Sequence, residues 1–276
     1  MNVQELKRTA NQVRKNIITA VYYAKAGHPG GSLSSAEIYT YLYMKEMNVD
    51  PADPGSPDRD RFVLSKGHTC PGLYGVMAER GFFDREELKT FRHVGSRLQG
   101  HPSMRMLPGI DMSTGSLGQG ISCAVGIAAA AKVKGKSYRT YTLLGDGEIE
   151  EGQVWEAAMF ASAKKLDNLC AIVDNNNLQI DGTLEEVNSP YPIDKKFEAF
   201  GFHVINVADG HDFDQLAAAF AEARTVKGQP TVIICKTTKG KGVSFMENNA
   251  GWHGKAPNEE EYKIAMADLE RIGESL

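Results

Sequence analysis

Short apolar runs alternate with stretches of helical periodicity along this chain of 276 residues. The runs rich in β-branched residues predict strands at residues 61–65, 140–144, 169–173, 204–207 and 231–237. Apolar positions three and four apart predict helices at residues 6–26, 34–43, 70–80, within 82–91, 121–134, about 151–166, 197–202, 213–226 and 259–276. This alternation predicts an α/β fold in three layers, an open and mainly parallel sheet with helices on both faces. We expect one domain over residues 1–276, with N-terminal helices at about 4–45 and a C-terminal helix at about 259–276.

The segment from Arg139 to Gly182 shows this order of elements most clearly. A strand ends at Leu144, the sequence Gly-Asp-Gly forces a tight turn, and a helix leads to a second buried strand. Because the two strands of a right-handed βαβ unit are parallel, Asp146 and Asn176 should lie at the same edge of the sheet. Ligands of open parallel sheets bind at this edge, so we expect a binding site there.

The residues expected at this edge offer oxygen donors. A carboxylate and an amide, without thiolate or imidazole, favour Mg²⁺ or Ca²⁺ over zinc. Since Mg²⁺ usually shares its coordination shell with substrate phosphates and water, the site implies a diphosphate ligand. Gly145 and Gly147 would let the phosphate approach the backbone, and the helix starting near Glu151 would direct its amino end towards the anion.

Composition narrows the function classes. A hydrophobic content of 42% and a formal charge of −4 describe a globular protein without the basic excess of a nucleic-acid binder. The sequence contains neither a signal peptide nor an apolar segment long enough to span a membrane, so we expect a cytoplasmic protein without a membrane partner. Reduced, mostly buried thiols are expected at the four dispersed cysteines, Cys70, Cys123, Cys170 and Cys235.

Several predicted turns carry residues suited to a polar ligand. His28, His68 and His101 each lie beside a glycine at a turn, and such a triple occurrence is harder to dismiss as structural than a single histidine. The small-residue loop 113–120 opens the helix at 121–134, which suits an anion or cofactor, although close helix packing would explain it too. Lys239 and Lys241 follow the strand at 231–237, where they could meet a phosphate or form a solvated turn.

The Gly-Asp-Gly turn followed by paired asparagines about thirty residues later resembles the thiamine diphosphate motif, in the version found in transketolases. Further transketolase-like segments follow the family's order from about residue 15 to 257: RFVLSKGH, LQGHPS, STGSLGQG, GDGEIEEGQVWEA, DNNNLQIDG, KTTKGKGVSFME and WHGKAP. The resemblance implies the thiamine diphosphate-binding fold, in the form of its diphosphate-binding domain.

The resemblance also implies roles for individual residues. Asp146, the side-chain oxygen of Asn176 and the carbonyl of Leu178 would hold Mg²⁺, which Ca²⁺ or Mn²⁺ could replace, on thiamine diphosphate. The other expected cofactor-binding residues are His68, Gly115, Leu117, Gly145, Gly147, Glu151, Lys239 and His253. The expected catalytic histidines, which bind sugar hydroxyls, contact the diphosphate or move protons, are His28, His68, His101 and His253. Glu151 and Glu156 match acids at the subunit interface of the family.

Transketolases resemble this chain only over their first domain. The glutamate that activates the cofactor lies on a second domain, so it cannot be named in this sequence. We therefore expect the N-terminal subunit of a split transketolase of the pentose phosphate pathway, with a C-terminal partner subunit that supplies the pyrimidine-binding domain and the activating glutamate. Self-association would give an α2β2 heterotetramer. This complex would transfer a two-carbon ketol unit, a glycolaldehyde group, from a ketose phosphate to an aldose phosphate.

Three alternatives remain at this point. The first is a transketolase-like enzyme for a modified sugar, such as a sulfonated one, because the residues that read the far end of the sugar lie on the missing domains. The second is the alpha subunit of a 2-oxo acid dehydrogenase, which shares the Gly-Asp-Gly motif but not the GHPGG, SKGH and TTKGKG segments. The third is a non-catalytic module that binds thiamine diphosphate.

Overall fold

The computed structural model describes all 276 residues and contains one parallel sheet. Its five strands run in the order β1-β2-β3-β5-β4, and they are β1 (Arg61–Leu64), β2 (Thr140–Gly145), β3 (Leu169–Asn175), β4 (His203–Val207) and β5 (Thr231–Lys236). Every neighbouring pair is parallel. All five strands predicted from the sequence are therefore confirmed, and the predicted α/β class with them.

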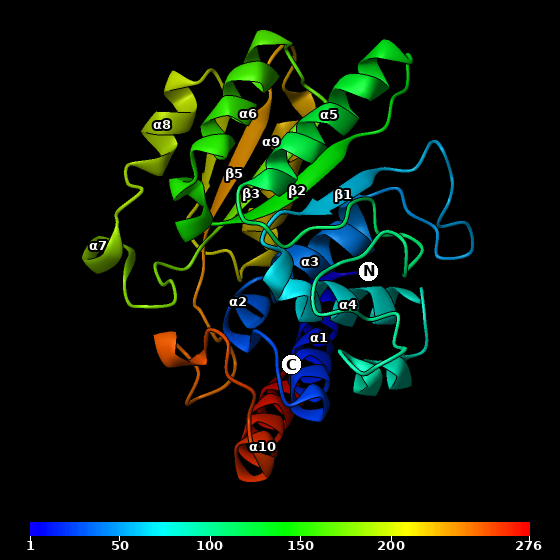
Figure 1. Cartoon of the computed structure of the whole chain (residues 1–276), viewed down its shortest axis with the longest axis vertical. Helices are drawn as coiled ribbons and strands as arrows, with labels where there is room; N and C mark the ends of the chain where they lie inside the picture. The colour runs from blue at the N-terminus through cyan, green and yellow to red at the C-terminus, as the bar shows by residue number, and fades with distance from the viewer.

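Alternate strand residues face two separate apolar clusters, and this produces the three layers (Figure 1). Leu143 and Ile172 belong to the cluster under helices α1 (Val3–Ala24), α3 (Ala36–Tyr41), α4 (Cys70–Arg80) and α9 (Phe213–Thr225). Leu144 and Val173 point the other way, into the cluster under helices α5 (Gln119–Val133), α6 (Gly152–Ala163) and α8 (Ile193–Ala199). Both faces are buried, as a parallel sheet requires.

The first and last helices pack together below the sheet (Figure 1). Helix α1 begins with a capping box formed by Asn2 and Glu5, and α10 (Glu259–Ser275) begins with another. Asn11 Nδ2 donates to the carbonyl of Leu269 at 2.8 Å, and the rings of Tyr22 and Tyr262 stack with centroids 4.1 Å apart. None of these helices combines the length and apolar character needed to cross a membrane.

Local structure differs from the sequence prediction in several places. The helix expected at 197–202 is α8, which spans Ile193–Ala199 and so begins and ends earlier than predicted. The expected loop at 27–31 is partly helical, because Pro29 begins helix α2 (Pro29–Ser34) with the backbone angle that suits a first helical position. The helix expected at 34–43 is interrupted at Ser35 and ends as a π-helical turn, Leu42–Glu46, in which the Met47 amide donates to the Leu42 carbonyl.

The remaining helical elements of the chain are short. The element expected within 82–91 is a 3₁₀ helix, Arg85–Thr90, and Asp84 caps it, since its side chain accepts from the Glu86 amide at 2.9 Å. Another 3₁₀ helix, Gly147–Glu150, separates the Gly-Asp-Gly turn from α6, which begins one residue after Glu151. The structure also has 3₁₀ turns at Gly67–Thr69 and Ala250–Trp252 and the short helix α7 (Leu184–Val187).

Candidate functional site

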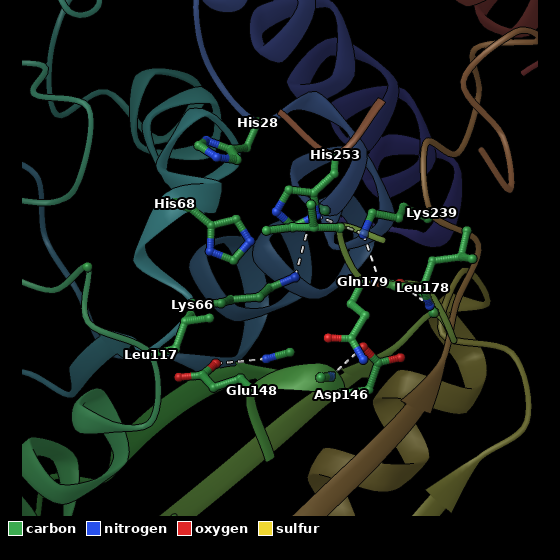
Figure 2. A pocket seen from close by; sticks show the side chains of 16 residues that line it. His28, Lys66, His68, Leu117, Asp146, Glu148, Leu178, Gln179, Lys239 and His253 are labelled. Carbon is green, nitrogen blue, oxygen red and sulfur yellow. Dashed lines mark hydrogen bonds between the residues drawn. The ribbon is translucent and has the colours of Figure 1, made fainter. Parts of the chain in front are cut away.

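A cavity of about 270 Å³ opens at the carboxyl ends of the strands (Figure 2). Sixteen residues from widely separated segments line it: His28, Gly31, Lys66, His68, Gly115, Leu117, Gly145, Asp146, Gly147, Glu148, Asn176, Leu178, Gln179, Ile180, Lys239 and His253. The strand register explains its position, because Gly145 of β2 pairs with Asp174 of β3 where both strands end. The cavity therefore lies at the edge where parallel sheets bind ligands.

Asp146 forms the floor of the cavity, between the ends of β2 and β3. Its carboxylate is 2% exposed and accepts the amides of Gly147 at 2.9 Å and Asn177 at 2.6 Å. The second bond joins the two strand ends, as the βαβ argument predicts. Burial, followed by repulsion from Asp174, raises the pKa of Asp146 to about 7. A cation bound next to this buried carboxyl group would favour its ionised form.

Asn176 and Leu178 present two further oxygens next to Asp146. Asn176 Nδ2 donates to Asp174 at 3.1 Å, and this bond directs Oδ1 away from Asp174, where it accepts the Leu178 amide at 3.2 Å. The Leu178 carbonyl accepts from the ammonium of Lys239 at 2.8 Å, so a positive charge already contacts one of the expected metal ligands. The three hard oxygens fit Mg²⁺, provided that phosphate and water complete its shell.

The chain offers no alternative metal centre built from protein side chains. It has no group of three or more His, Cys, Asp or Glu residues placed to hold an ion. Only one of the three expected ligands, Asp146, is a carboxylate, and the others are an amide and a backbone carbonyl. Such a sparse donor set is typical of Mg²⁺ sites that depend on a phosphate ligand.

A fully buried ion pair supports Asn176 from below. Lys66 Nζ lies 2.5 Å from Asp174 Oδ2, and the two side chains are 2% and 0% exposed. Asp174 also accepts from the hydroxyls of Ser34 at 2.6 Å and Thr237 at 2.5 Å. Burial alone would raise the pKa of Asp174, but the charge of Lys66 and these hydrogen bonds lower it. The pair thus keeps a charged acceptor in place for the amide of Asn176.

Glu148 connects three segments at the cavity wall. Its carboxylate accepts from the Ser65 hydroxyl at 2.5 Å and from the amides of Gly118 and Gly145, both at 2.9 Å. These bonds fix the loop 113–118 against the ends of β1 and β2. Gly120 permits the same approach, because a Cβ there would lie 2.5 Å from Ser65 Cα.

Three histidines line the opposite side of the cavity (Figure 2). The rings of His28, His68 and His253 lie with centroids 5.1 to 5.4 Å apart. Burial lowers the pKa of His28 to about 4 and of His253 to about 3, and it lowers the pKa of His68 as well. All three are therefore neutral near pH 7, and each ring can both donate and accept a hydrogen bond.

Lys239 links the histidine side of the cavity to the oxygen donors. Its ammonium lies 3.0 Å from His253 Nδ1 as well as 2.8 Å from the Leu178 carbonyl, and the residue is 2% exposed. Burial lowers the pKa of Lys239 to about 8. An ammonium held here between an imidazole and a carbonyl is available to a polyanion entering the cavity.

Comparison with known proteins identifies the family. Residues 5–270 match the family described as transketolase, thiamine diphosphate binding domain. The chain belongs to the transketolase family. Membership favours a transketolase-type transferase over the 2-oxo acid dehydrogenase alternative.

Relatives of two lengths match the chain. It is 45% identical to the 6-deoxy-6-sulfo-D-fructose transketolase subunit SqwG of Clostridium sp. (strain MSTE9), with 98% of each chain covered. It is 44% identical to an apulose-4-phosphate transketolase subunit of Phocaeicola vulgatus, with 99% and 96% covered. The crystal structure of transketolase from Campylobacter jejuni superposes with a TM-score of 0.91 at 35% identity, covering 98% of this chain and 43% of that one. The chain thus spans less than half of that transketolase.

Most of the transketolase-like residues expected from the sequence line the cavity. They are His28, His68, Gly115, Leu117, Gly145, Asp146, Gly147, Asn176, Leu178, Lys239 and His253. Two lie outside it. His101 is exposed, although its ring lies beside Gly115, where a Cβ would be 3.1 Å from His101 Cδ2. Glu151 is exposed at the start of α6 and does not line the cavity, although it lies against Gly118, where a Cβ would be 2.7 Å from Glu151 Cβ.

Sequence reasoning missed three polar residues of the cavity. Lys66 and Glu148 stand inside the matched segments RFVLSKGH and GDGEIEEGQVWEA, but a lysine or glutamate at a strand end has no distinctive pattern. Gln179 follows the asparagine run, and its amide donates to Glu150 at 3.0 Å. Burial would have been the useful signal for Lys66 and Glu148, and the sequence does not contain it.

Proposed function

We propose that the chain is the N-terminal subunit of a two-subunit transketolase that uses thiamine diphosphate and Mg²⁺. The observation that supports this most directly is the convergence of the oxygens of Asp146, Asn176 and Leu178 below three neutral histidines in one cavity. A regulatory cofactor-binding module would need the oxygen donors but not the histidines. Ca²⁺ or Mn²⁺ would serve in place of Mg²⁺ because the ligands are hard oxygens.

In this proposal the chain binds and orients the cofactor. Asp146, Asn176 and Leu178 would hold the metal, and Lys239 would leave the Leu178 carbonyl to neutralise the charge of the diphosphate. The cofactor, when bound, would supply a carbon nucleophile. The neutral rings of His28 and His253 donate hydrogen bonds to sugar hydroxyls or accept their protons. His101, exposed beside Gly115, would meet substrate at the entrance.

The remaining groups of the active site come from a partner in this proposal. No glutamate of this chain is assigned to activate the cofactor, and apolar side chains at the cavity, Leu117 and Ile180, are 37% and 66% exposed. Relatives of the same length are named as subunits, whereas the longer transketolase continues beyond the matched region. A C-terminal subunit would cover the cavity and supply the pyrimidine-binding domain, and pairing of two such units would give α2β2.

A modified sugar is the second candidate for the substrate. The two relatives of about the same length as this chain are named for a sulfonated fructose and for apulose 4-phosphate. The cavity contacts the reacting end of a ketose, where ordinary and modified sugars are alike. The choice between pentose phosphate pathway sugars and modified sugars would then depend on the partner.

Co-purification of the partner and an assay of ketol transfer test the proposal. The tagged chain is purified from its own organism's lysate, co-purifying proteins are identified by mass spectrometry, and ketol transfer is assayed with thiamine diphosphate and Mg²⁺ for both sugar classes. We expect a stoichiometric partner, no turnover by the chain alone, and turnover by the complex that Asp146→Asn abolishes. Ketol transfer by the isolated chain would refute the shared site. A complex that binds the cofactor without turnover on any sugar would favour the binding module.

A further inference from the structure

A buried polar cluster lies outside the cavity, between α1, α3 and the turn that precedes α9. It consists of Arg14, Glu37 and His211, whose side chains are 7%, 8% and 12% exposed. Glu37 Oε2 accepts from Arg14 Nη2 at 2.6 Å and lies 2.8 Å from His211 Nδ1. None of the three residues lines the cavity. Any effect of this cluster on the site must therefore pass through other residues.

The hydrogen bonds fix the protonation of His211. The backbone amide of Thr238 lies 2.9 Å from His211 Nε2, and a backbone amide can only donate. Nε2 is therefore the acceptor, and the ring proton is on Nδ1, which donates to Glu37. The ring is held as one neutral tautomer, because Glu37 accepts a hydrogen bond from Nδ1 and the Thr238 amide donates one to Nε2. This chain of bonds leads from a buried carboxylate to the backbone of the loop that follows β5.

Arg14 reaches the same loop from the other side. Its Nε donates to the carbonyl of Lys241 at 3.0 Å while its Nη2 is bound to Glu37. The two contacts fix the loop at Thr238 and at Lys241, one residue before and two residues after Lys239. Between them the Gly240 amide donates to the Gly30 carbonyl at 3.0 Å. The loop backbone is thus held on three sides, and Lys239 is the residue that it presents to the cavity.

We propose that Arg14, Glu37 and His211 act as positioning residues that hold the Thr238–Lys241 loop so that Lys239 meets the diphosphate. This inference rests on the proposed function, because it assumes a diphosphate at the cavity floor. A lysine binds an anion more tightly when its backbone is already fixed, since with a mobile backbone the binding step must also order the loop. Residues that support metal ligands change metal affinity or activity by about 10- to 100-fold, and we expect an effect towards the lower end of this range here.

The test measures the affinity of the full chain for pyrophosphate at saturating Mg²⁺ by titration calorimetry. His211→Phe keeps the ring volume but removes both hydrogen bonds, and His211→Gln restores them, with the amide nitrogen to Glu37 and the amide oxygen to Thr238. Arg14→Lys keeps the charge beside Glu37 and removes the second contact. The matched control is Arg59→Lys, since Arg59 is also buried, paired with Asp111 at 2.7 Å and bonded to backbone, but at the opposite edge of the sheet.

We expect His211→Phe and Arg14→Lys to weaken pyrophosphate binding at least about tenfold, and His211→Gln and Arg59→Lys to stay within about threefold of the wild type. The Thr238 amide should exchange with solvent faster in His211→Phe than in His211→Gln. If His211→Phe does not fold, Arg14→Lys against Arg59→Lys decides the question.

Three results would overturn the inference. Wild-type affinity in a folded His211→Phe or Arg14→Lys chain would show that the cluster does not act on the site. An equal loss in Arg59→Lys would show a general effect of stability. Absence of pyrophosphate binding by the wild type would refute the diphosphate site itself, and with it the proposed function.

Discussion

Replacing Lys66 by methionine tests the ion pair beneath the cavity. The change keeps an unbranched side chain one atom shorter and removes its charge, while Asp174 stays 0% exposed with no other cation within hydrogen-bonding distance. Removing one member of a buried ion pair costs about 3–5 kcal/mol, because the remaining charge is left without compensation. Asp174 retains the hydroxyl donors of Ser34 and Thr237, so we expect the lower end, about 3 kcal/mol.

The measurement is urea unfolding at pH 7, followed by tryptophan fluorescence and circular dichroism. Lys263→Met is the control, because the two side chains of its ion pair with Glu259 are 70% and 71% exposed, and such a solvent-screened pair contributes little to stability. The double variant Lys66→Met/Asp174→Asn should be more stable than Lys66→Met, because it no longer buries an unpaired charge. The reasoning is refuted if Lys66→Met costs no more than Lys263→Met, or if the Lys66 and Asp174 changes are additive.

Three further changes test other parts of the structure. Burial by itself would raise the pKa of Glu37, but the charge of Arg14 and the contact with His211 outweigh burial and lower this pKa from 4.5 to about 2. The ionised Glu37 therefore stabilises the fold fully above pH 4.5, and this stabilisation is lost as the pH falls towards 2. Glu37→Gln should therefore flatten the pH dependence of urea unfolding by about 3 kcal/mol, and parallel curves would contradict this. Gly240→Ala should lower the melting temperature much more than the control Gly81→Ala does. Both glycines have positive φ, but only a Cβ at position 240 would collide with a backbone atom, the carbonyl oxygen of Met246. Asp146→Asn should weaken Mg²⁺-dependent pyrophosphate binding at least about tenfold in calorimetry, since it removes the only charged metal ligand; unchanged affinity would exclude that metal site.

The strands were predictable because a fully buried parallel strand has a strong signal. Residues 169–173 are uninterrupted apolar residues, and β3 adds only Asp174 and Asn175 to them. The proximity of Asp146 to the asparagine run followed from chain direction alone, and the bond from the Asn177 amide to Asp146 confirms it. These features depend on local sequence and on a general rule of handedness.

Features that depend on distant contacts were not predictable. The order of β4 and β5 in the sheet is set by packing between elements far apart in the chain. The segment around His28 was predicted as a turn, yet the fixed φ of Pro29 also suits the first helical position, and tertiary contacts decide between the two. Lys66 was missed because its burial depends on Asp174, 108 residues later. The 3₁₀ helix between the turn and α6 was not foreseen either, because the sequence pattern predicts that the turn leads directly into the helix.

The pairing of α1 with α10 has a consequence for how the protein is made. Helix α1 leaves the ribosome before α10, which covers part of it and follows more than 200 residues later. Until α10 emerges, one side of α1 has no partner, and the loop that Arg14 anchors through Lys241 has not been synthesised for most of that time. The cavity is therefore completed only after Lys239 and His253 have been translated, and the nascent chain must keep α1 from aggregating until then.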